Sequence, residues 1–339
     1  MIIRATSYPR AGLIGNPSDG YFGKTISFAF SNFRAEVMMY HSPELEIIGN
    51  VTDHTKFDSF QSLVGDISTH GYYGGVRLLK ASLKTFFDYC CRMKIQLDDR
   101  NFTVRYSTDI PHGVGLAGSS AIITACFRAL IAFYGVSISK ATLANLVLSV
   151  ETDELGISAG LQDRVVQAYE GLVYMDFDKT TMERQGYGYY EPLDPSALPE
   201  LYIAYRNDLS QCSDVVHNRL RDRYNTGDQD VFDAIDFWAG LADQAKDRLS
   251  KGQGRKIGEL LDANFDMRAK LCKLSEGNIR MIEVARSVGA SAKFTGSGGA
   301  IVGTCKDSEM IDELVKQFEE AGITVIRPVI ASGSTEDVR

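Results

Sequence analysis

The stretch Pro111–Ala121 combines glycines with two consecutive serines, a composition suited to binding phosphate. It reads PHGVGLAGSSA, follows the strand-like segment Phe102–Ser107 and precedes a long apolar stretch. Glycines let the backbone approach a phosphate closely, and the N–H groups and dipole of a following helix favour negative charge. Ser119 and Ser120 add hydroxyls, of which one can cap the helix and the other can reach a nucleotide-bound Mg²⁺. On local grounds alone, an ordinary glycine-serine turn with a helix cap stays an equal alternative.

Two other glycine clusters come close to known phosphate-binding motifs without matching them. Gly20–Thr25 ends like a Walker A loop, but Ser18 stands where that loop requires a glycine. Gly296–Ile301 begins like a dinucleotide fingerprint and then lacks the last glycine. Neither standard assignment therefore applies.

Three segments occur in the order of the three signatures of a known enzyme family. They are RAGLIGNPSD (Arg10–Asp19), the loop Pro111–Ala121, and KFTGSGGA (Lys293–Ala300). Together they resemble the signatures of the GHMP kinases, which include galactokinase, homoserine kinase, mevalonate kinase and phosphomevalonate kinase. The resemblance implies an α+β fold, a two-layer α/β arrangement of two domains with the active site in the cleft between them. It also implies ATP and Mg²⁺ as cofactors.

The first segment departs from the usual family pattern, which has Lys at position 10 and Glu-His at positions 16 and 17. The forms found here, with AGLQDRV from Ala159 and NFDxR at Asn264–Arg268, resemble those of the plant-type glucuronokinases. This implies ATP-dependent phosphorylation of the anomeric (C1) hydroxyl of a sugar or sugar acid, with D-glucuronate favoured. Another hexose, a uronate or a heptose is the nearest alternative acceptor. A second hypothesis, from a different class, is a sensor that has this fold and binds nucleotide or sugar without turnover. A third, a mevalonate-type or homoserine-type kinase, is disfavoured by the NPSD form of the first segment.

The resemblance implies catalytic roles for Asp163, Arg164 and Arg10. Asp163 matches the catalytic aspartate of the galactokinase and mevalonate kinase branches, which makes it the expected general base. Its neighbour Arg164 could stabilise the carboxylate or hold the transferring phosphoryl group. Arg10 stands in place of the family's lysine and could bind substrate or phosphate as a planar fork. Without the motif, Asp163 would be a helix cap and Arg10 a surface charge at a strand end.

The expected metal ligands are Ser120 and Glu151. Glu151 lies twelve positions before Asp163, and a glutamate placed similarly in the family joins the loop's second serine in holding Mg²⁺. Carboxylate and hydroxyl oxygens suit this ion, with phosphates and water filling the other positions. A lone glutamate in a helix is otherwise more often just solvated.

The other predicted contacts divide between nucleotide and sugar. The nucleotide is assigned to Pro111, Gly113, Gly115, Leu116, Ala117, Gly118, Ser119, Ser120 and Ala121. The sugar is assigned to Asn16, Asp19, Tyr21, Gly296, Ser297 and Gly298, with Asp19 accepting hydrogen bonds from ring hydroxyls. Plain turns are the alternative for both the NPSDG and the GSGG segments.

Two contacts are left unassigned. A uronate carboxylate would need a bidentate cation, for which Arg10, Arg164, Arg206 and Arg268 are unranked candidates. Tyr72, Tyr73 and Trp238 could stack on adenine, although isolated aromatics more often belong to the core.

The elements that must position these residues can be outlined from periodicity. Strands are expected at KTISFAF, FRAEVMMY, LEIIG, FTVRYS, LYIAYR, SAKFT, AIVGTC and ITVIRP. Helices are expected at about 75–93, 118–134, 140–154 and 308–320, with several more between 213 and 287. Glycines and prolines between Phe177 and Leu201 predict a linker. We therefore expect a nucleotide- and substrate-binding domain at 1–180 and a C-terminal α+β domain at 181–339.

Composition limits the remaining possibilities. The chain has 339 residues, of which 44% are apolar and 24% charged, which is ordinary globular usage and indicates a soluble protein without a membrane segment. Its net charge of −8 argues against nucleic acid as a partner. Six cysteines without a CxxC pair fit a reducing cytoplasm. A monomer and a homodimer both stay open.

Overall fold

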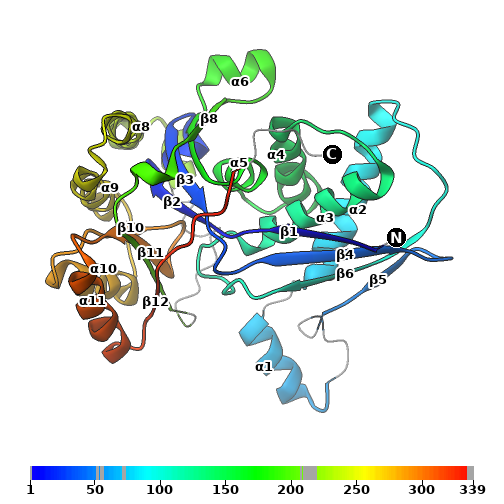
Figure 1. Cartoon of the computed structure of the whole chain (residues 1–339), viewed down its shortest axis with the longest axis horizontal. Coiled ribbons are helices and arrows are strands. Elements are labelled where there is room, and N and C mark those ends of the chain that lie inside the picture. The colour runs from blue at the N-terminus through cyan, green and yellow to red at the C-terminus, as the bar shows by residue number, and fades with distance from the viewer. Residues whose placement is uncertain are drawn as a thin grey trace.

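A computed structural model describes residues 2–50, 53, 57–70, 74–206, 208 and 220–333, and it builds the chain from three four-stranded sheets. Tyr72 and Tyr73 lie outside the described residues. Figure 1 shows one sheet on one side of the molecule and the other two together on the opposite side. None of the described helices combines the length and apolar composition that a membrane crossing requires.

The first sheet has the order β1-β4-β6-β5 and supports the phosphate loop. Its strands are β1 (Ile2–Ser7), β4 (Ala35–His41), β6 (Phe102–Thr108) and β5 (Glu46–Ile48), of which only the β5–β6 pair is parallel. Helices α2 (Gly75–Arg92) and α3 (Gly118–Tyr134) pack together over one face, while α1 (Phe60–His70) lies on the other side (Figure 1). Helix α3 is apolar nearly all round and is buried, so its first turn is firmly placed.

The second sheet has the order β2-β3-β7-β8 and carries the first signature. It consists of β2 (Arg10–Ile14), β3 (Lys24–Ala29), β7 (Leu172–Asp176) and β8 (Tyr189–Leu193), all antiparallel. The first two strands are joined through the short helix η1 (Ser18–Tyr21). Because α8 (Gln229–Ser250) and α5 (Gln162–Tyr169) both pack on β3, this sheet is buried where it meets the site.

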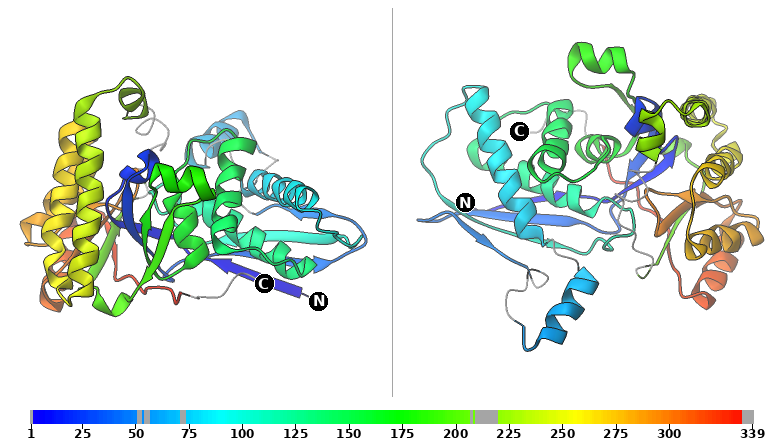
Figure 2. Two further views of the ribbon diagram at one scale, coloured as in Figure 1. Left: turned by 90° about the horizontal axis from the view of Figure 1, so that it is seen from above. Right: turned by 180° about the vertical axis from the view of Figure 1, so that it is seen from behind.

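The third sheet has the order β10-β11-β9-β12 and carries the third signature. Its strands are β10 (Lys293–Phe294), β11 (Ala300–Thr304), β9 (Leu201–Tyr205) and β12 (Thr324–Ile326). Helices α9 (Gly258–Leu271), α10 (Glu276–Ser287) and α11 (Ser308–Glu320) pack against it. Helix α9 also runs beside α8 at this end of the molecule (Figure 2).

Two predicted regions differ from the structure. The helix expected over 140–154 is α4 (Lys140–Ser149), followed by a turn of π-helix, η2 (Val150–Glu154). The expected linker contains α6 (Lys179–Gln185), β8 and the short helix η3 (Pro195–Ala197). Strand β8 extends the sheet of the first half of the chain, because its residues alternate against β7 in regular register. Placing a domain boundary at 180/181 stays a prediction.

Candidate active site

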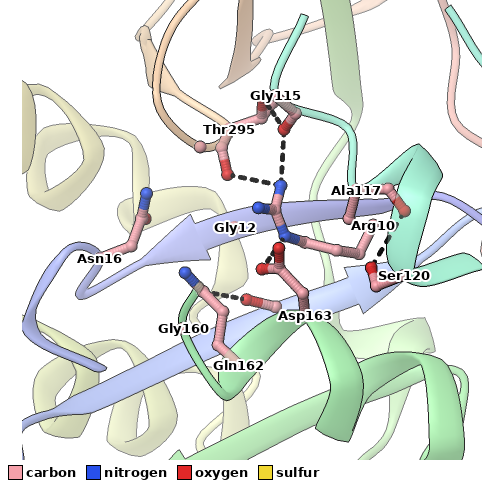
Figure 3. A network of polar contacts seen from close by, with 12 residues as sticks. Arg10, Gly12, Asn16, Gly115, Ala117, Ser120, Gly160, Gln162, Asp163 and Thr295 are labelled. Atoms are coloured by element: carbon pink, nitrogen blue, oxygen red, sulfur yellow. Dashed lines mark hydrogen bonds and ion pairs between the residues drawn. The ribbon is translucent and has the colours of Figure 1, made fainter. Parts of the chain in front are cut away.

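Arg10, the first residue of β2, connects the three signatures. Its Nε donates to Asp163 Oδ1 at 2.6 Å, and its Nη1 donates to the carbonyl oxygens of Gly115 at 2.6 Å and Thr295 at 3.2 Å (Figure 3). The residue is only 5% exposed, so it is not the surface charge that its strand-end position would allow. One guanidinium thus joins the phosphate loop, the third signature and the expected base.

The backbones of the signatures approach each other at glycines. Gly12 N donates to Thr295 O at 2.9 Å, and a Cβ at Gly12 would lie 2.7 Å from that oxygen. Gly115 has a φ of +72°, and a Cβ there would lie 2.9 Å from Gly298 O. Side chains at either position would therefore force the segments apart. The phosphate loop and the third signature therefore approach each other closely.

Asp163 is the second residue of α5 and faces two arginines. Besides Arg10, it contacts Arg164, whose Nη1 lies 3.1 Å from Asp163 Oδ2. The helix is preceded by Leu161 at its cap position, and no side chain caps it. Asp163 is therefore not a helix cap, and its side chain keeps 16% of its surface exposed.

Arg164 is buried, and its guanidinium group is bound by other groups of the protein. It donates to Gly160 O at 2.6 Å and forms a short ion pair with Glu151. Glu151 itself is 2% exposed and lies on the π-turn η2. The alternative of a solvated glutamate is thus excluded, because this carboxylate is half of a buried ion pair. Turns of π-helix are often found at functional sites.

The two serines at the start of α3 have different partners. Ser119 Oγ lies 2.7 Å from Glu151 Oε1, whereas Ser120 Oγ donates to Ala117 O at 3.1 Å. Ser119 is therefore the serine that contacts Glu151 directly, and joint binding of Mg²⁺ by Ser120 and Glu151 stays a prediction. The helical rotation between neighbouring positions turns Ser119 toward η2 and Ser120 back onto its own first turn.

The oxygen atoms of Ser119, Ser120 and Glu151 fit Mg²⁺ as a partly protein-bound ion. Within the described part of the chain, no three His, Cys, Asp or Glu side chains gather as a metal cage. The protein offers one carboxylate with a hydroxyl 2.7 Å away, at the N-terminal end of α3. Mg²⁺ is commonly held by one or two such groups together with phosphates and water, so these residues fit it.

Asp19, in η1, is the second carboxylate at the site. Its Oδ1 accepts from Gln162 Nε2 at 3.2 Å, and a Cβ on Gly160 would lie 2.6 Å from its Oδ2. Burial, and then repulsion by Asp163, raises the pKa of Asp19 to about 6, although Arg10 opposes the shift. The two carboxylates are therefore close enough for the charge of one to disfavour ionisation of the other.

Asn16 and Tyr21 are both buried, and their assignment to the sugar stays a prediction. Asn16 is 2% exposed, its backbone oxygen accepts from Asn264 Nδ2 at 3.0 Å, and its side chain accepts from Lys293. Tyr21 is 4% exposed and packs against the ring of Tyr224 at 5.0 Å between centroids. Both side chains therefore support the turn that holds Asp19.

The third signature is held from behind by α9 and α10. Arg268 donates to Gly296 O at 2.8 Å and to Ser297 O at 3.1 Å. Asn278 Oδ1 accepts from Gly299 N at 2.8 Å. Gly296, Ser297 and Gly298 thus lie across from the loop as a fixed backbone wall.

Several supporting residues were not predicted. They include Asn264, Lys293, Thr295 and Gln162, each of which bonds to a signature residue. The only sequence signal for Asn264 is the NFDxR segment, in which only Arg268 was considered, as a candidate for binding a substrate carboxylate. Trp238 is wholly buried and donates to Asn264 O at 3.1 Å, which makes it a core residue rather than a candidate for adenine stacking.

Comparison with known proteins identifies the family. Residues 77–171 match the family described as GHMP kinases N terminal domain. The chain is 42% identical to glucuronokinase 1 of Arabidopsis thaliana over 343 residues, covering 99% of this chain and 94% of that protein. This chain is a GHMP kinase.

Further similarities agree with the GHMP kinase assignment. Probable glucuronokinase 2 of Arabidopsis thaliana is 44% identical over 331 residues, covering 95% of this chain and 90% of that protein. The structure of Lactococcus lactis galactokinase complexed with galactose matches with a TM-score of 0.72 at 16% identity, covering 98% and 95% of the two chains. That structural match shows the mixed α/β fold. The GHMP kinase is thus a small-molecule kinase, which implies ATP as the phosphoryl donor.

Proposed function

We propose that this GHMP kinase transfers the γ-phosphoryl group of ATP to the anomeric hydroxyl of D-glucuronate. The proposal rests on the two similar proteins named as glucuronokinases, each more than 40% identical over nearly the whole chain. The structural observation that carries it is the contact of Arg10 with Asp163, Gly115 and Thr295. It brings a partly exposed carboxylate to the meeting point of the phosphate loop and the third signature.

Asp163 is proposed as the group that orients and deprotonates the anomeric hydroxyl. The sugar oxygen forms a bond to the γ-phosphorus, the bond from phosphorus to the bridging oxygen of ADP breaks, and the hydroxyl proton passes to Asp163. Arg10 and Arg164 fix the carboxylate before substrate arrives. Because Arg10 Nη2 has no hydrogen-bond partner among the described residues, it can face the transferring group as charge develops.

The nucleotide phosphates are proposed to bind the loop at Pro111–Ala121, from Gly113 and Gly115 to Ser119 and Ser120. Their negative charge is favoured by the backbone N–H groups and dipole at the start of α3, a helix of 17 residues. Glu151 with the seryl hydroxyls would hold Mg²⁺, which when bound neutralises phosphate charge. Ser120 stays the expected metal ligand from the family pattern, and Ser119 is the serine that contacts Glu151 in this structure.

The acceptor sugar is proposed to lie between Asp19 and the backbone wall of Gly296, Ser297 and Gly298. Ionised Asp19 can accept hydrogen bonds from ring hydroxyls, and the glycines leave room for a ring. Another hexose, uronate or heptose would use the same groups, so the acceptor must be decided by measurement.

ADP release with Mg-ATP should be measured against a panel of free uronates, hexoses and heptoses. We expect D-glucuronate to give the highest kcat/KM. If a neutral hexose gave a higher kcat/KM than every uronate, the proposed acceptor would be wrong and that hexose would take its place. ATP binding without turnover on any sugar would instead identify a sensor.

A further inference from the structure

The arginines expected to bind a substrate carboxylate are all occupied by the protein. Arg10 and Arg164 hold Asp163 and Glu151, and Arg268 holds the carbonyl oxygens of the third signature. The fourth, Arg206, pairs with Asp208, with Nε 2.8 Å from Oδ1. None of these four offers an unoccupied guanidinium fork to a carboxylate.

A fifth arginine, Arg221, lies beside the turn that carries Asp19. Its guanidinium carbon is 4.8 Å from the centroid of the Tyr21 ring. A Cβ on Gly20 would lie 3.5 Å from Arg221 Nη2, so the charged group adjoins the residue directly after Asp19. Arg221 is exposed, and it forms no ion pair with any residue in the described ranges.

The position of Arg221 is fixed by its own helical segment, residues 220–225. Tyr224, one turn later on the same face, packs on Tyr21. Arg223 ties the segment to Asp228 at 2.7 Å and to Leu271 O at 3.1 Å. The guanidinium also interacts with the Tyr21 hydroxyl, which holds it in place, and its remaining N–H groups can meet a carboxylate.

We infer that Arg221 binds the carboxylate of a uronate acceptor and selects it over neutral sugars. This assignment rests on the proposed function. In this arrangement Asp163 receives the reacting hydroxyl, Asp19 receives the ring hydroxyls, and Arg221, which adjoins Gly20, receives the carboxylate of the sugar. Asp19 cannot take that last role, because two carboxylates repel each other. Arg221 thereby supplies a cation beside the turn that carries Asp19.

The test compares D-glucuronate with D-glucuronamide, which has the same shape without the charge. In the wild type we expect kcat/KM to be higher for the carboxylate. Arg221→Gln should lower kcat/KM for glucuronate about 10- to 100-fold, the effect of losing a charge-assisted hydrogen bond, while glucuronamide and ATP change little. Arg221→Lys should retain part of the preference.

Arg223→Gln is the matched control, since it removes an arginine from the same segment without facing Tyr21. Equal losses on both sugars in the two variants would show that Arg221 only supports the segment, and the inference would be overturned. An Arg221→Gln enzyme that kept the full preference for glucuronate would overturn it as well. If the wild type phosphorylates only neutral sugars, both the proposed acceptor and the role of Arg221 fail. That result would be seen in the wild type alone, so it can be distinguished from a failure of the Arg221 assignment, which appears only in the variants.

Discussion

The two carboxylates of the pocket have different surroundings. Asp163 faces the guanidinium groups of Arg10 and Arg164, at 2.6 Å and 3.1 Å. Asp19 accepts from the amide of Gln162, at 3.2 Å, and lies against Gly160. The phosphoryl end of the site is therefore charge-balanced and fixed in advance, whereas the carboxylate at the acceptor end forms no ion pair within the described part of the chain.

Because of this difference, we expect the two ends of the site to affect different kinetic constants. A fixed carboxylate beside two cations suits a step in which charge moves, so substitutions at the phosphoryl end should act on kcat. A carboxylate with a raised pKa, near an arginine that forms no ion pair within the described residues, suits recognition of the acceptor, so substitutions there should act on KM and on its pH dependence.

The largest effect is expected for Asp163→Asn. General-base assistance is typically worth about 10²–10⁴-fold, so kcat should fall by that factor. The dissociation constant for ATP should hardly change, since the nucleotide is assigned to the loop and α3. Steady-state kinetics together with calorimetric ATP titration would check this. A variant with nearly full kcat would leave positioning and Mg²⁺ as the whole catalytic apparatus.

A smaller loss is expected when the metal-side oxygens are removed one at a time. Ser120→Ala should lower kcat/KM for Mg-ATP about 10- to 100-fold, by analogy with other changes at metal sites. Its thermal stability should change little, because Ala117 O also accepts from Gln167 Nε2 at 2.9 Å. Ser119→Ala is the matched comparison. If only Ser119→Ala lowered kcat/KM, the metal ligand would be Ser119, which contacts Glu151, and not Ser120.

Glu151→Gln should combine a kinetic and a structural effect. Breaking a buried ion pair costs about 3–5 kcal/mol, and the remaining contact of Arg164 with Asp163 places this case at the lower end. A lower melting temperature is therefore expected together with weaker use of Mg-ATP. An unchanged melting temperature would contradict the buried ion pair.

The smallest effect is expected for Asp19→Asn, a few-fold rise in KM for the sugar. In the wild type, kcat/KM should rise with pH through about 6 as Asp19 ionises and becomes a full acceptor, and the variant should lack this limb. Stability should move in the opposite direction. Because burial raises the pKa of Asp19 from 3.8, the folded state loses stability as pH rises through about 6. Thermal melting across this range should show a shallower decline in Asp19→Asn.

The sequence predicted the elements better than the contacts between them. Helix α3 could be predicted from Gly118 to Tyr134, because glycines precede it and a continuous apolar stretch fills it. Arg10 could not be predicted as the central connection, since its partners lie 105, 153 and 285 positions away. Strand β8 was missed because it contains Pro192 and is flanked by glycines and further prolines, which are typical of a linker; proline is tolerated at the edge of a sheet, where β8 lies.

The choice between neighbouring serines also exceeds what a sequence can decide. Ser119 and Ser120 are chemically the same, and only the rotation of α3 relative to η2 determines which hydroxyl contacts Glu151. Likewise, Arg221 has no motif of its own. Its significance depends on η1 folding beneath it and on other arginines being occupied.

The most direct test of the account is the position of the phosphate in the product. D-Glucuronate and Mg-ATP should be incubated with the protein, and the product examined by ³¹P NMR and by an assay for reducing sugar. If the anomeric hydroxyl is the one that meets Asp163, phosphorus should couple to the anomeric proton and the reducing end should disappear as ADP forms. A product that keeps its reducing end and carries phosphate on another hydroxyl would contradict the account.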